Sequence, residues 1–336
     1  MMRPRPVVLI AVLALILPLV GATQRGPAVS PRPTTVRMVT GQADALTGQK
    51  RRPTYSARVD LATVPVIVLD QAGLPVDQVQ AEEFLVRQDG VELPATMAFE
   101  LHEMPLDLAV VVDRSGSMGH RDGRSRAHAL LEVLEPVDRV VLITFNQDVD
   151  EPRWGPADDP DLHELLQRTR AEGATALYDA IVVAVEELGP ARTGRRRAII
   201  VISDGSDSSS SHSANDAMVA AQQAGVPIFP LLTSPTRFGP PLPPTSIAGR
   251  QRGGPMSSTS SRLLAGVAIF SGGASLPLDS RYQQALRWLR GTYVVGFPLK
   301  TATAVESEPM ADTAHDIRLR VDRPGVRVLY ARQIYR

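Results

Sequence analysis

Apolar residues follow two different patterns along this chain, and the pattern changes near residue 105. Between about 105 and 232, short runs that are apolar on both faces alternate with segments of helical periodicity. The apolar runs lie at 108–112, 139–145, 198–202 and 226–232, and the helical segments at 124–134, 162–168, 177–188 and 214–224. Strands without a polar face are typical of parallel sheets covered on both sides. This region therefore predicts an α/β fold, a doubly wound, mostly parallel sheet with helices on both faces.

Both flanks of this region show the shorter alternation of β-strands. Before it, strands are predicted at 61–69, 84–88 and 96–101, and a turn at Asp89-Gly90 favours a hairpin-like unit of 84–88 with 96–101. After it, two helices (262–270, 281–290) and a short strand (275–278) precede strands at 293–297, 317–321 and 326–330. A turn at Arg323-Pro324-Gly325 predicts antiparallel pairing of these last strands. We expect small β extensions from both flanks.

The expected organisation has five parts. They are a signal peptide (1–22), a linker rich in Pro, Arg, Thr, Gln and Gly (23–57), a small β module (58–104), the α/β domain (105–290) and a C-terminal β extension (291–336). Within the α/β domain, residues 234–261 form a low-complexity loop, longer than the roughly 12–15 residues at which structureless loops become uncommon. This loop is either a tolerated insertion or a rim beside a binding site.

The N-terminal segment bears on the compartment. Arg3 and Arg5 precede an apolar run from Val7 to Val20, and Gly21-Ala22 supplies small residues. This is the pattern of a cleavable secretory signal, and the run is shorter than the roughly 18–20 residues that span a bilayer comfortably. An uncleaved membrane anchor and a buried segment are the alternatives. We expect an exported protein that is periplasmic, secreted or associated with the cell envelope, with any membrane contact made through an uncleaved N-terminus.

Composition excludes several classes of function. The chain has 36 basic and 36 acidic residues and 4% aromatic residues, so neither a basic excess nor a stacking platform points to nucleic acid. Because it has no cysteine, disulfides, thiolate metal sites and cysteine nucleophiles are absent. Its six histidines show no His-Glu-x-x-His motif and no pair at helical spacing, which argues against zinc.

Side chains with hydroxyl or carboxylate oxygen gather after the strand at 108–112. Asp113, Ser115 and Ser117 lie within five residues of one loop, at the carboxyl edge of the predicted sheet, where ligands bind in such folds. Helix capping explains one such side chain but not three. Oxygen ligands suit a hard cation such as Mg²⁺. Thr175 and Asp204 fall at two further loops of the same edge and strengthen the prediction.

These three motifs resemble the metal-ion-dependent adhesion site (MIDAS) of von Willebrand factor type A (VWA) domains, in order and approximate spacing. The motifs are Asp-Arg-Ser-Gly-Ser-Met (113–118), Gly-Ala-Thr-Ala-Leu-Tyr-Asp (173–179) and Ser-Asp-Gly (203–205). The resemblance covers about residues 105–300. The two flanks extend it to a bacterial VWA-related group, frequent in acidobacteria, whose function is poorly defined. A short stretch after Met118, beginning Gly-His-Arg-Asp-Gly, departs from the family and suggests a late or truncated first helix.

The resemblance implies a role for each residue. Ser115, Ser117 and Thr175 would be direct ligands, while Asp113 and Asp204 would hold coordinating waters and the serines. The ion would be Mg²⁺, with Mn²⁺ or Ca²⁺ as alternatives, and an Asp or Glu of a partner protein would fill an open coordination position. Asp179 and Asp207 are candidates for bracing the site. For Asp179, a first-turn carboxylate favoured by the helix dipole is an equal alternative.

Enzymatic function is disfavoured. Ser117 does not lie in a Gly-x-Ser-x-Gly elbow, and Ser115 stands where a phosphoryl-accepting aspartate normally has an acidic neighbour. We therefore expect a non-catalytic, cation-dependent binding module for adhesion or assembly. The alternatives are an envelope scaffold whose metal only stabilises the fold, and a metal-assisted phosphohydrolase. The basic run 195–197 is interpreted as a solvated strand entrance, with an anionic partner as the alternative.

Overall fold

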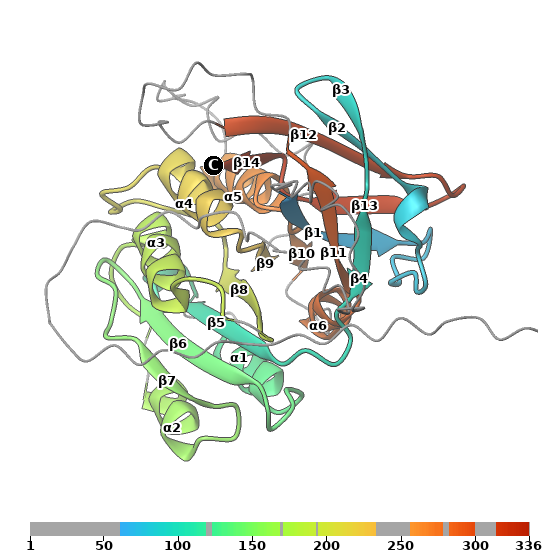
Figure 1. Cartoon of the computed structure of the whole chain (residues 1–336). Coiled ribbons are helices and arrows are strands. Elements are labelled where there is room, and N and C mark those ends of the chain that lie inside the picture. Colours follow the sequence, from blue (N-terminus) through green and yellow to red (C-terminus); the bar gives the residue numbers. More distant parts are fainter. Residues whose placement is uncertain are drawn as a thin grey trace, which may run out of the picture.

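The computed structural model describes residues 61–118, 123–168, 171–192, 194–232, 256–277, 282–299 and 314–335. Within them the chain forms one six-stranded and two four-stranded sheets with helices (Figure 1). The predicted signal peptide and linker, at 1–22 and 23–57, lie outside the described residues. Among the helices that are described, none is long and apolar enough to cross a bilayer.

The six-stranded sheet follows the prediction for the central region. Its order is β10-β9-β8-β5-β6-β7, and all neighbours are parallel except β6 and β7. The strands are β5 (Leu106–Asp113), β6 (Arg139–Phe145), β7 (Arg153–Pro156), β8 (Arg196–Ser203), β9 (Ile228–Leu232) and β10 (Leu276–Pro277). Every residue of β5 is buried, because it lies inside the sheet with helices on both faces. The predicted mixed α/β fold is confirmed.

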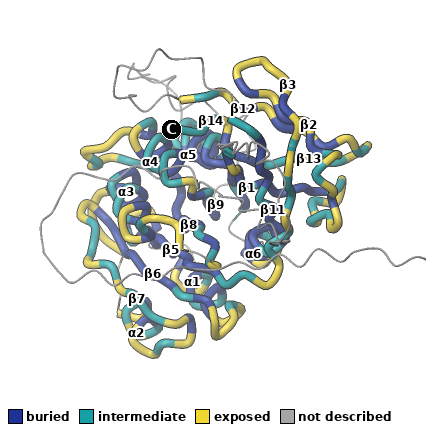
Figure 2. The backbone as a smooth tube through the Cα atoms, viewed as in Figure 1, coloured by how far each residue is buried: buried dark blue, intermediate teal, exposed yellow. Residues whose placement is uncertain are grey.

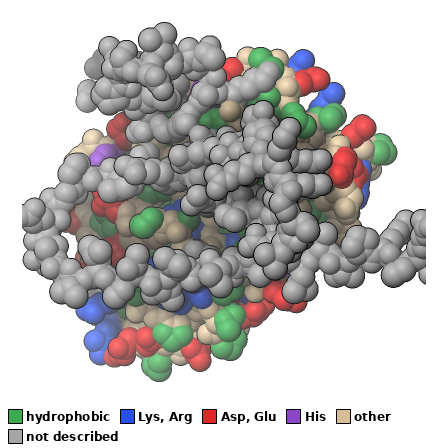
Figure 3. Space-filling model, in the orientation of Figure 1, with side chains coloured by type: hydrophobic (Ala, Val, Ile, Leu, Met, Phe, Trp, Pro, Cys, Tyr) green, Lys and Arg blue, Asp and Glu red, His purple; other side chains and the backbone are tan. Residues whose placement is uncertain are grey.

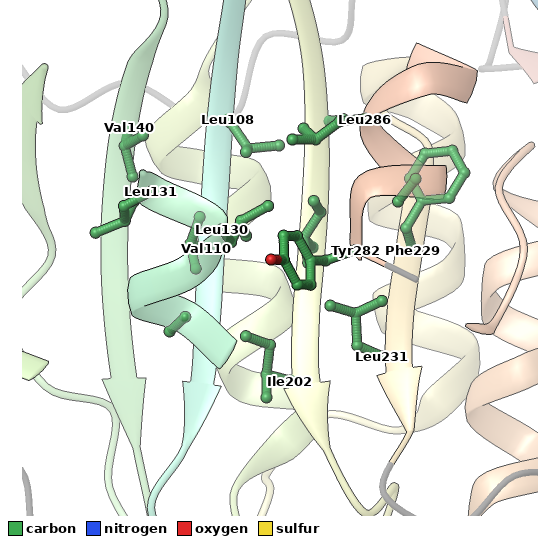
Figure 4. Close-up of a cluster of buried hydrophobic side chains, with 14 of the residues drawn as sticks. Leu108, Val110, Leu130, Leu131, Val140, Ile202, Phe229, Leu231, Tyr282 and Leu286 are labelled. Atoms are coloured by element: carbon green, nitrogen blue, oxygen red, sulfur yellow. The ribbon is translucent and has the colours of Figure 1, made fainter. Parts of the chain in front are cut away.

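Helices cover the two faces of this sheet in two groups. One face packs against α1 (Gly123–Leu131), α2 (Pro160–Arg168) and α6 (Tyr282–Arg290), where Leu130, Leu286 and the ring of Tyr282 meet Leu108 and Val110 of β5 (Figure 4). The other face packs against α3 (Leu177–Leu188), α4 (Ala214–Ala224) and α5 (Met256–Phe270). Alternate residues of β5 therefore serve two separate cores. Figure 2 shows the neighbouring strand β6 mostly in the colour of buried residues.

The two flanks combine into one β unit. One sheet has the order β13-β1-β11-β4 and the other β14-β12-β2-β3. Its strands are β1 (Leu61–Leu69), β2 (Phe84–Gln88), β3 (Val91–Pro94), β4 (Met97–Glu100), β11 (Thr292–Pro298), β12 (Ala314–Val321), β13 (Arg327–Tyr330) and β14 (Gln333–Tyr335), with a 3-10 turn at Ala81–Glu83. Apolar side chains of both sheets share one core. The proposed boundaries at 58, 105 and 291 stay a prediction.

Two pairing predictions in the flanks are wrong. β2 pairs with β3 across the turn at Asp89-Gly90, whereas the strand predicted at 96–101 contributes β4 to the other sheet, beside β11. Likewise β12 and β13, on either side of the turn at 323–325, do not pair; β12 pairs with β2 and β13 with β1. The first error arose because the short strand β3, directly after the turn, was not recognised. In the second, the turn at 323–325 is a local signal, but β12 and β13 pair with strands that are distant in the sequence.

Two helix boundaries also differ from the sequence interpretation. Helix α5 begins at Met256, so the last part of the 234–261 loop is helical, and residues 233–255 lie outside the described ones. Helix α1 spans Gly123–Leu131 and therefore ends before residue 134, where the predicted helix ended.

The basic run 195–197 is not a solvated strand entrance. Arg195 Nε donates to Asp107 Oδ1 at 2.6 Å, and Arg196 is buried and donates to the carbonyls of Met104 and Leu289. Arg197 donates to Ala224 O at 2.6 Å. The guanidinium groups thus satisfy backbone carbonyls where β8 enters the sheet. On the face shown in Figure 3, the acidic and basic side chains visible over α2 and β7 are intermixed.

Candidate metal centre

Three loops meet at the carboxyl edge of the central sheet. β5 and β8 are parallel neighbours with Val112 opposite Ile202, so Asp113 and Ser203, the last residues of the two strands, lie side by side. Ser203 Oγ donates to Asp113 Oδ2 at 2.6 Å, and both side chains are buried. The parallel register thereby joins the first predicted motif to the third.

The first loop is folded around the carboxylate of Asp113. The backbone N–H of Ser115 donates to Asp113 Oδ1 at 2.8 Å, and the Oγ atoms of Ser115 and Ser117 are 3.1 Å apart. Arg114, between Asp113 and Ser115 in the sequence, forms a bidentate ion pair with Asp150 at 2.8 and 2.7 Å. Asp150 is thus the partner of Arg114, the one cationic side chain among the described residues of this loop. The three oxygen-bearing side chains of the loop, those of Asp113, Ser115 and Ser117, lie grouped.

Backbone hydrogen bonds attach the second loop to the first. Gly116 N–H donates to Gly173 O at 3.1 Å, and Glu172 N–H donates to Arg114 O at 2.8 Å. Gly173 has φ of +79° and is packed closely against side chains of Asn146 and Gln147, so a residue without Cβ suits this position. These contacts hold the second loop, which carries the buried Thr175, against the serine loop.

The third loop is attached to the second through Thr175. Ser208 and Ser209 donate their backbone N–H groups to Thr175 O at 2.8 and 3.0 Å, and Thr175 N–H donates back to Ser208 Oγ at 3.0 Å. Asp204 is buried, and its Oδ1 accepts from Ser206 N–H at 2.9 Å. From α5, Ser261 Oγ donates to Asp204 O at 2.8 Å. The loops that carry all five candidate ligands are therefore bonded into one network.

The carboxylates of Asp179 and Asp207 stabilise loops through hydrogen bonds to the backbone. They are not part of the set of hydroxyl side chains described above. Asp207 Oδ1 accepts from Leu177 N–H at 2.9 Å, and Ser210 Oγ accepts from Tyr178 N–H at 3.0 Å, so the third loop caps α3. Asp179 accepts from the backbone N–H groups of Ser211 and His212 at 2.9 and 2.8 Å. Its carboxylate therefore does more than complement the helix dipole.

The electrostatics of the edge favour a cation. Burial raises the pKa of the Asp113 carboxyl, and the negative charge of Asp204 raises it further, although hydrogen bonds from Ser115 and Ser203 oppose this. Two buried carboxylates close together are costly unless a positive charge compensates them. The hydroxyls of Ser115 and Ser117 lie on the loop of Asp113, and Thr175 lies on a loop attached to it, so the candidate donors are all hard oxygens, the ligand type that a cation such as Mg²⁺ prefers.

Comparison with known families agrees with this geometry. Residues 107–235 match the model of the von Willebrand factor type A domain. The chain contains a VWA domain. It resembles the uncharacterized protein sll0103 of Synechocystis sp., with 28% identity in an alignment 174 residues long that covers 47% of this chain and 36% of that protein. The match thus spans about a third of the length of the relative.

Solved VWA-related structures are more distant. An aerotolerance-related membrane protein from Bacteroides fragilis is 19% identical, with a TM-score of 0.43 and coverage of 55% of this chain and 98% of that one. BatB from Bacteroides thetaiotaomicron is 22% identical, with a TM-score of 0.42 over 55% of this chain and 96% of that one. The manganese-loaded TRAP protein of Plasmodium vivax is 12% identical, with a TM-score of 0.38 over 74% and 97%.

The sequence interpretation missed three hydroxyl residues of the network. Ser203 ends an apolar strand and could have been noted as the residue beside Asp204. Ser208 is one of four successive serines (208–211) that the sequence does not distinguish, and no sequence signal links Ser261 to Asp204, because α5 lies far along the chain.

Proposed function

We propose that the VWA domain is a non-catalytic, divalent-cation-dependent protein-binding module. Ser115, Ser117 and Thr175 would hold the ion directly, and Asp113 and Asp204 would hold its waters. The observation that supports this most strongly is the buried pair of carboxylates, Asp113 and Asp204, with the grouped hydroxyls of Ser115 and Ser117 on the same loop as Asp113. The bound ion would be Mg²⁺, with Mn²⁺ or Ca²⁺ as alternatives. Because hydroxyl ligands are neutral, they would not offset the whole charge of the ion, which would leave it able to attract a carboxylate.

The partner in this proposal is a protein that offers an Asp or Glu side chain. Ser117 is exposed at the end of the first loop, whereas Asp113 and Ser115 are buried beneath it, so an approaching carboxylate reaches the site from the side of Ser117. The N-terminal signal pattern supports an interaction outside the cytoplasm, and adhesion or envelope assembly is the role we propose for it.

Uptake of Mn²⁺, followed by electron paramagnetic resonance, tests the ion-binding part of the proposal. Asp113→Ala should lose the tight Mn²⁺ site and keep the far-ultraviolet circular dichroism of the wild type. The matched control is Asp159→Ala, because Asp159 also follows a strand but only caps α2 through Asp161 N–H at 2.9 Å. If Asp113→Ala binds Mn²⁺ as the wild type does, the assignment of these ligands is wrong.

A pull-down from envelope extract tests the partner. Capture that requires Mg²⁺, is reversed by EDTA and is lost in Asp113→Ala supports a binding module. The alternative is an envelope scaffold in which the ion only stabilises the loops, and the dense hydrogen bonding among those loops favours it as second candidate. In that case EDTA would lower the thermal midpoint without releasing partners.

A further inference from the structure

A second group of metal-ligating side chains lies where the β unit joins the α/β domain. Asp77 is in the loop after β1, Glu100 ends β4, and His102 follows it before β5 begins. One ligand atom from each of the three lies within 4.8 Å of the others. His102 lies just before the start of β5, and Asp113 is the last residue of that strand. At the rise of about 3.3 Å per residue of a strand, the two groups of side chains are about 25 Å apart.

The contact between His102 and Glu100 is close without being a hydrogen bond. His102 Nε2 lies 2.9 Å from Glu100 Oε1 and 3.9 Å from Asp77 Oδ1. Glu100 Oε1 is shielded from solvent, and within the described part of the chain it has no hydrogen-bond partner of acceptable geometry. Buried polar atoms are nearly always hydrogen-bonded, and a bound ion or water is one of the explanations for an exception of this kind.

The backbone, rather than attraction among the side chains, brings the three residues together. Tyr293 of β11 lies opposite Glu100 in the sheet register. Its hydroxyl donates to Val76 O at 2.8 Å and accepts from Val79 N–H at 3.2 Å, which fixes the chain on both sides of Asp77. These two hydrogen bonds preorganise the loop that carries Asp77.

The chemistry of the donor set identifies the ion. An imidazole nitrogen with two carboxylate oxygens suits Zn²⁺, whereas Mg²⁺ and Ca²⁺ prefer oxygen alone. Bond lengths of about 2.1 Å in a tetrahedral site place ligand atoms about 3.4 Å apart, within the range of separations seen here. Asp77 and His102 also line a cleft of about 550 Å³, which leaves room for a fourth, non-protein ligand.

We propose that Asp77, Glu100 and His102 form a zinc site with one coordination position open to this cleft. No sequence motif announces it, since the ligands come from two segments separated by β2, β3 and β4. The site is independent of the proposed cation site at Asp113, and a bound ion would join the loop after β1 to the segment that leads into β5.

Cobalt titration of the full chain in the Asp113→Ala background tests the proposal. That background removes the other candidate site, and Co²⁺ reports nitrogen and oxygen ligands through its visible absorption. We expect one Co²⁺ to bind, Zn²⁺ to displace it, and millimolar Mg²⁺ to leave it bound. His102→Ala should weaken Zn²⁺ binding at least 100-fold. The control is His315→Ala, because His315 pairs with one carboxylate only, Asp89 at 2.8 Å.

Further measurements separate loss of the site from loss of the fold. His102 and Asp77 are largely exposed, so His102→Ala and Asp77→Asn should unfold in EDTA at the temperature of their background. Zn²⁺ should raise the unfolding temperature of the Asp113→Ala background and should leave that of the two variants unchanged. If the Co²⁺ spectrum survives His102→Ala, or no Co²⁺ binds, the site does not exist. If Asp77→Asn binds Zn²⁺ unchanged, the three-ligand assignment is wrong.

Discussion

Replacing Gly205 by alanine tests how the loop that carries Asp204 is held. Gly205 has φ of +84°, and a Cβ there would lie 2.9 Å from Ser261 Cα and 3.2 Å from Ser261 N. Both atoms belong to the backbone of α5, which cannot rotate away as the end of a side chain can. The same helix binds the carbonyl of Asp204 through Ser261 Oγ. A methyl group at Gly205 would therefore separate two elements that meet beside the candidate metal centre.

The expected loss of stability has two parts. An alanine in the left-handed region costs about 1–2 kcal/mol. Pressing a methyl group against a packed backbone costs about 1–3 kcal/mol more. Gly205→Ala should thus lower the free energy of unfolding by about 2–5 kcal/mol. Gly90 is the matched control, since its φ is +83° and nothing lies within 4 Å of its Cβ position. Gly90→Ala should show the first part alone.

Urea unfolding, followed by tryptophan fluorescence, measures the difference as a shift of midpoint at constant slope. Mn²⁺ binding to the folded variants shows whether the displaced loop also weakens the ion site. If Gly205→Ala and Gly90→Ala lose equal stability, the contact with α5 does not hold this loop and the reasoning fails.

Two further predictions concern side chains away from the metal centre. Arg196→Lys should lower the free energy of unfolding by about 2 kcal/mol, because a lysine cannot reach both carbonyls that Arg196 satisfies, those of Met104 and Leu289. The control is Arg192→Lys at an exposed position, which should change the free energy of unfolding by less than about 0.5 kcal/mol. Hydrogen bonds from Arg323 lower the pKa of Glu83 from 4.5 to about 2, so this pair stabilises the fold above pH 4.5 and the contribution is lost between pH 4.5 and 2. Thermal midpoints of Glu83→Gln should depend less on pH in that window than those of the wild type, and an unchanged dependence would contradict the assignment.

The central sheet was predictable because its signals are local. Runs such as 139–145 and 198–202 are too apolar for any position but a buried parallel strand, and Gly225 ends α4 in the left-handed conformation expected of a C-cap. Once these strands are parallel, Asp113 and Asp204 must emerge at the same edge. The order of the motifs was therefore enough to group the candidate ligands.

Long-range pairing was not predictable in the same way. Nothing near Leu61–Leu69 indicates that β11 and β13 will flank it, because antiparallel partners are chosen by burial across the whole flank. The arginines at 195–197 were misplaced for a related reason. Their partners, among them Met104, Leu289 and Ala224, are carbonyls of distant segments that only the folded chain brings near.

The pairing of β1 limits how the chain can be shortened. β1 lies between β11 and β13, so one residue of it, Val66, faces Tyr293 on one side and Tyr330 on the other. Cutting the chain after α6 would remove both neighbours at once and leave a strand rich in valine with two open edges. Such edges recruit strands from other molecules. Fragments designed to isolate the VWA domain should therefore omit residues 61–100 together with the tail, or keep both.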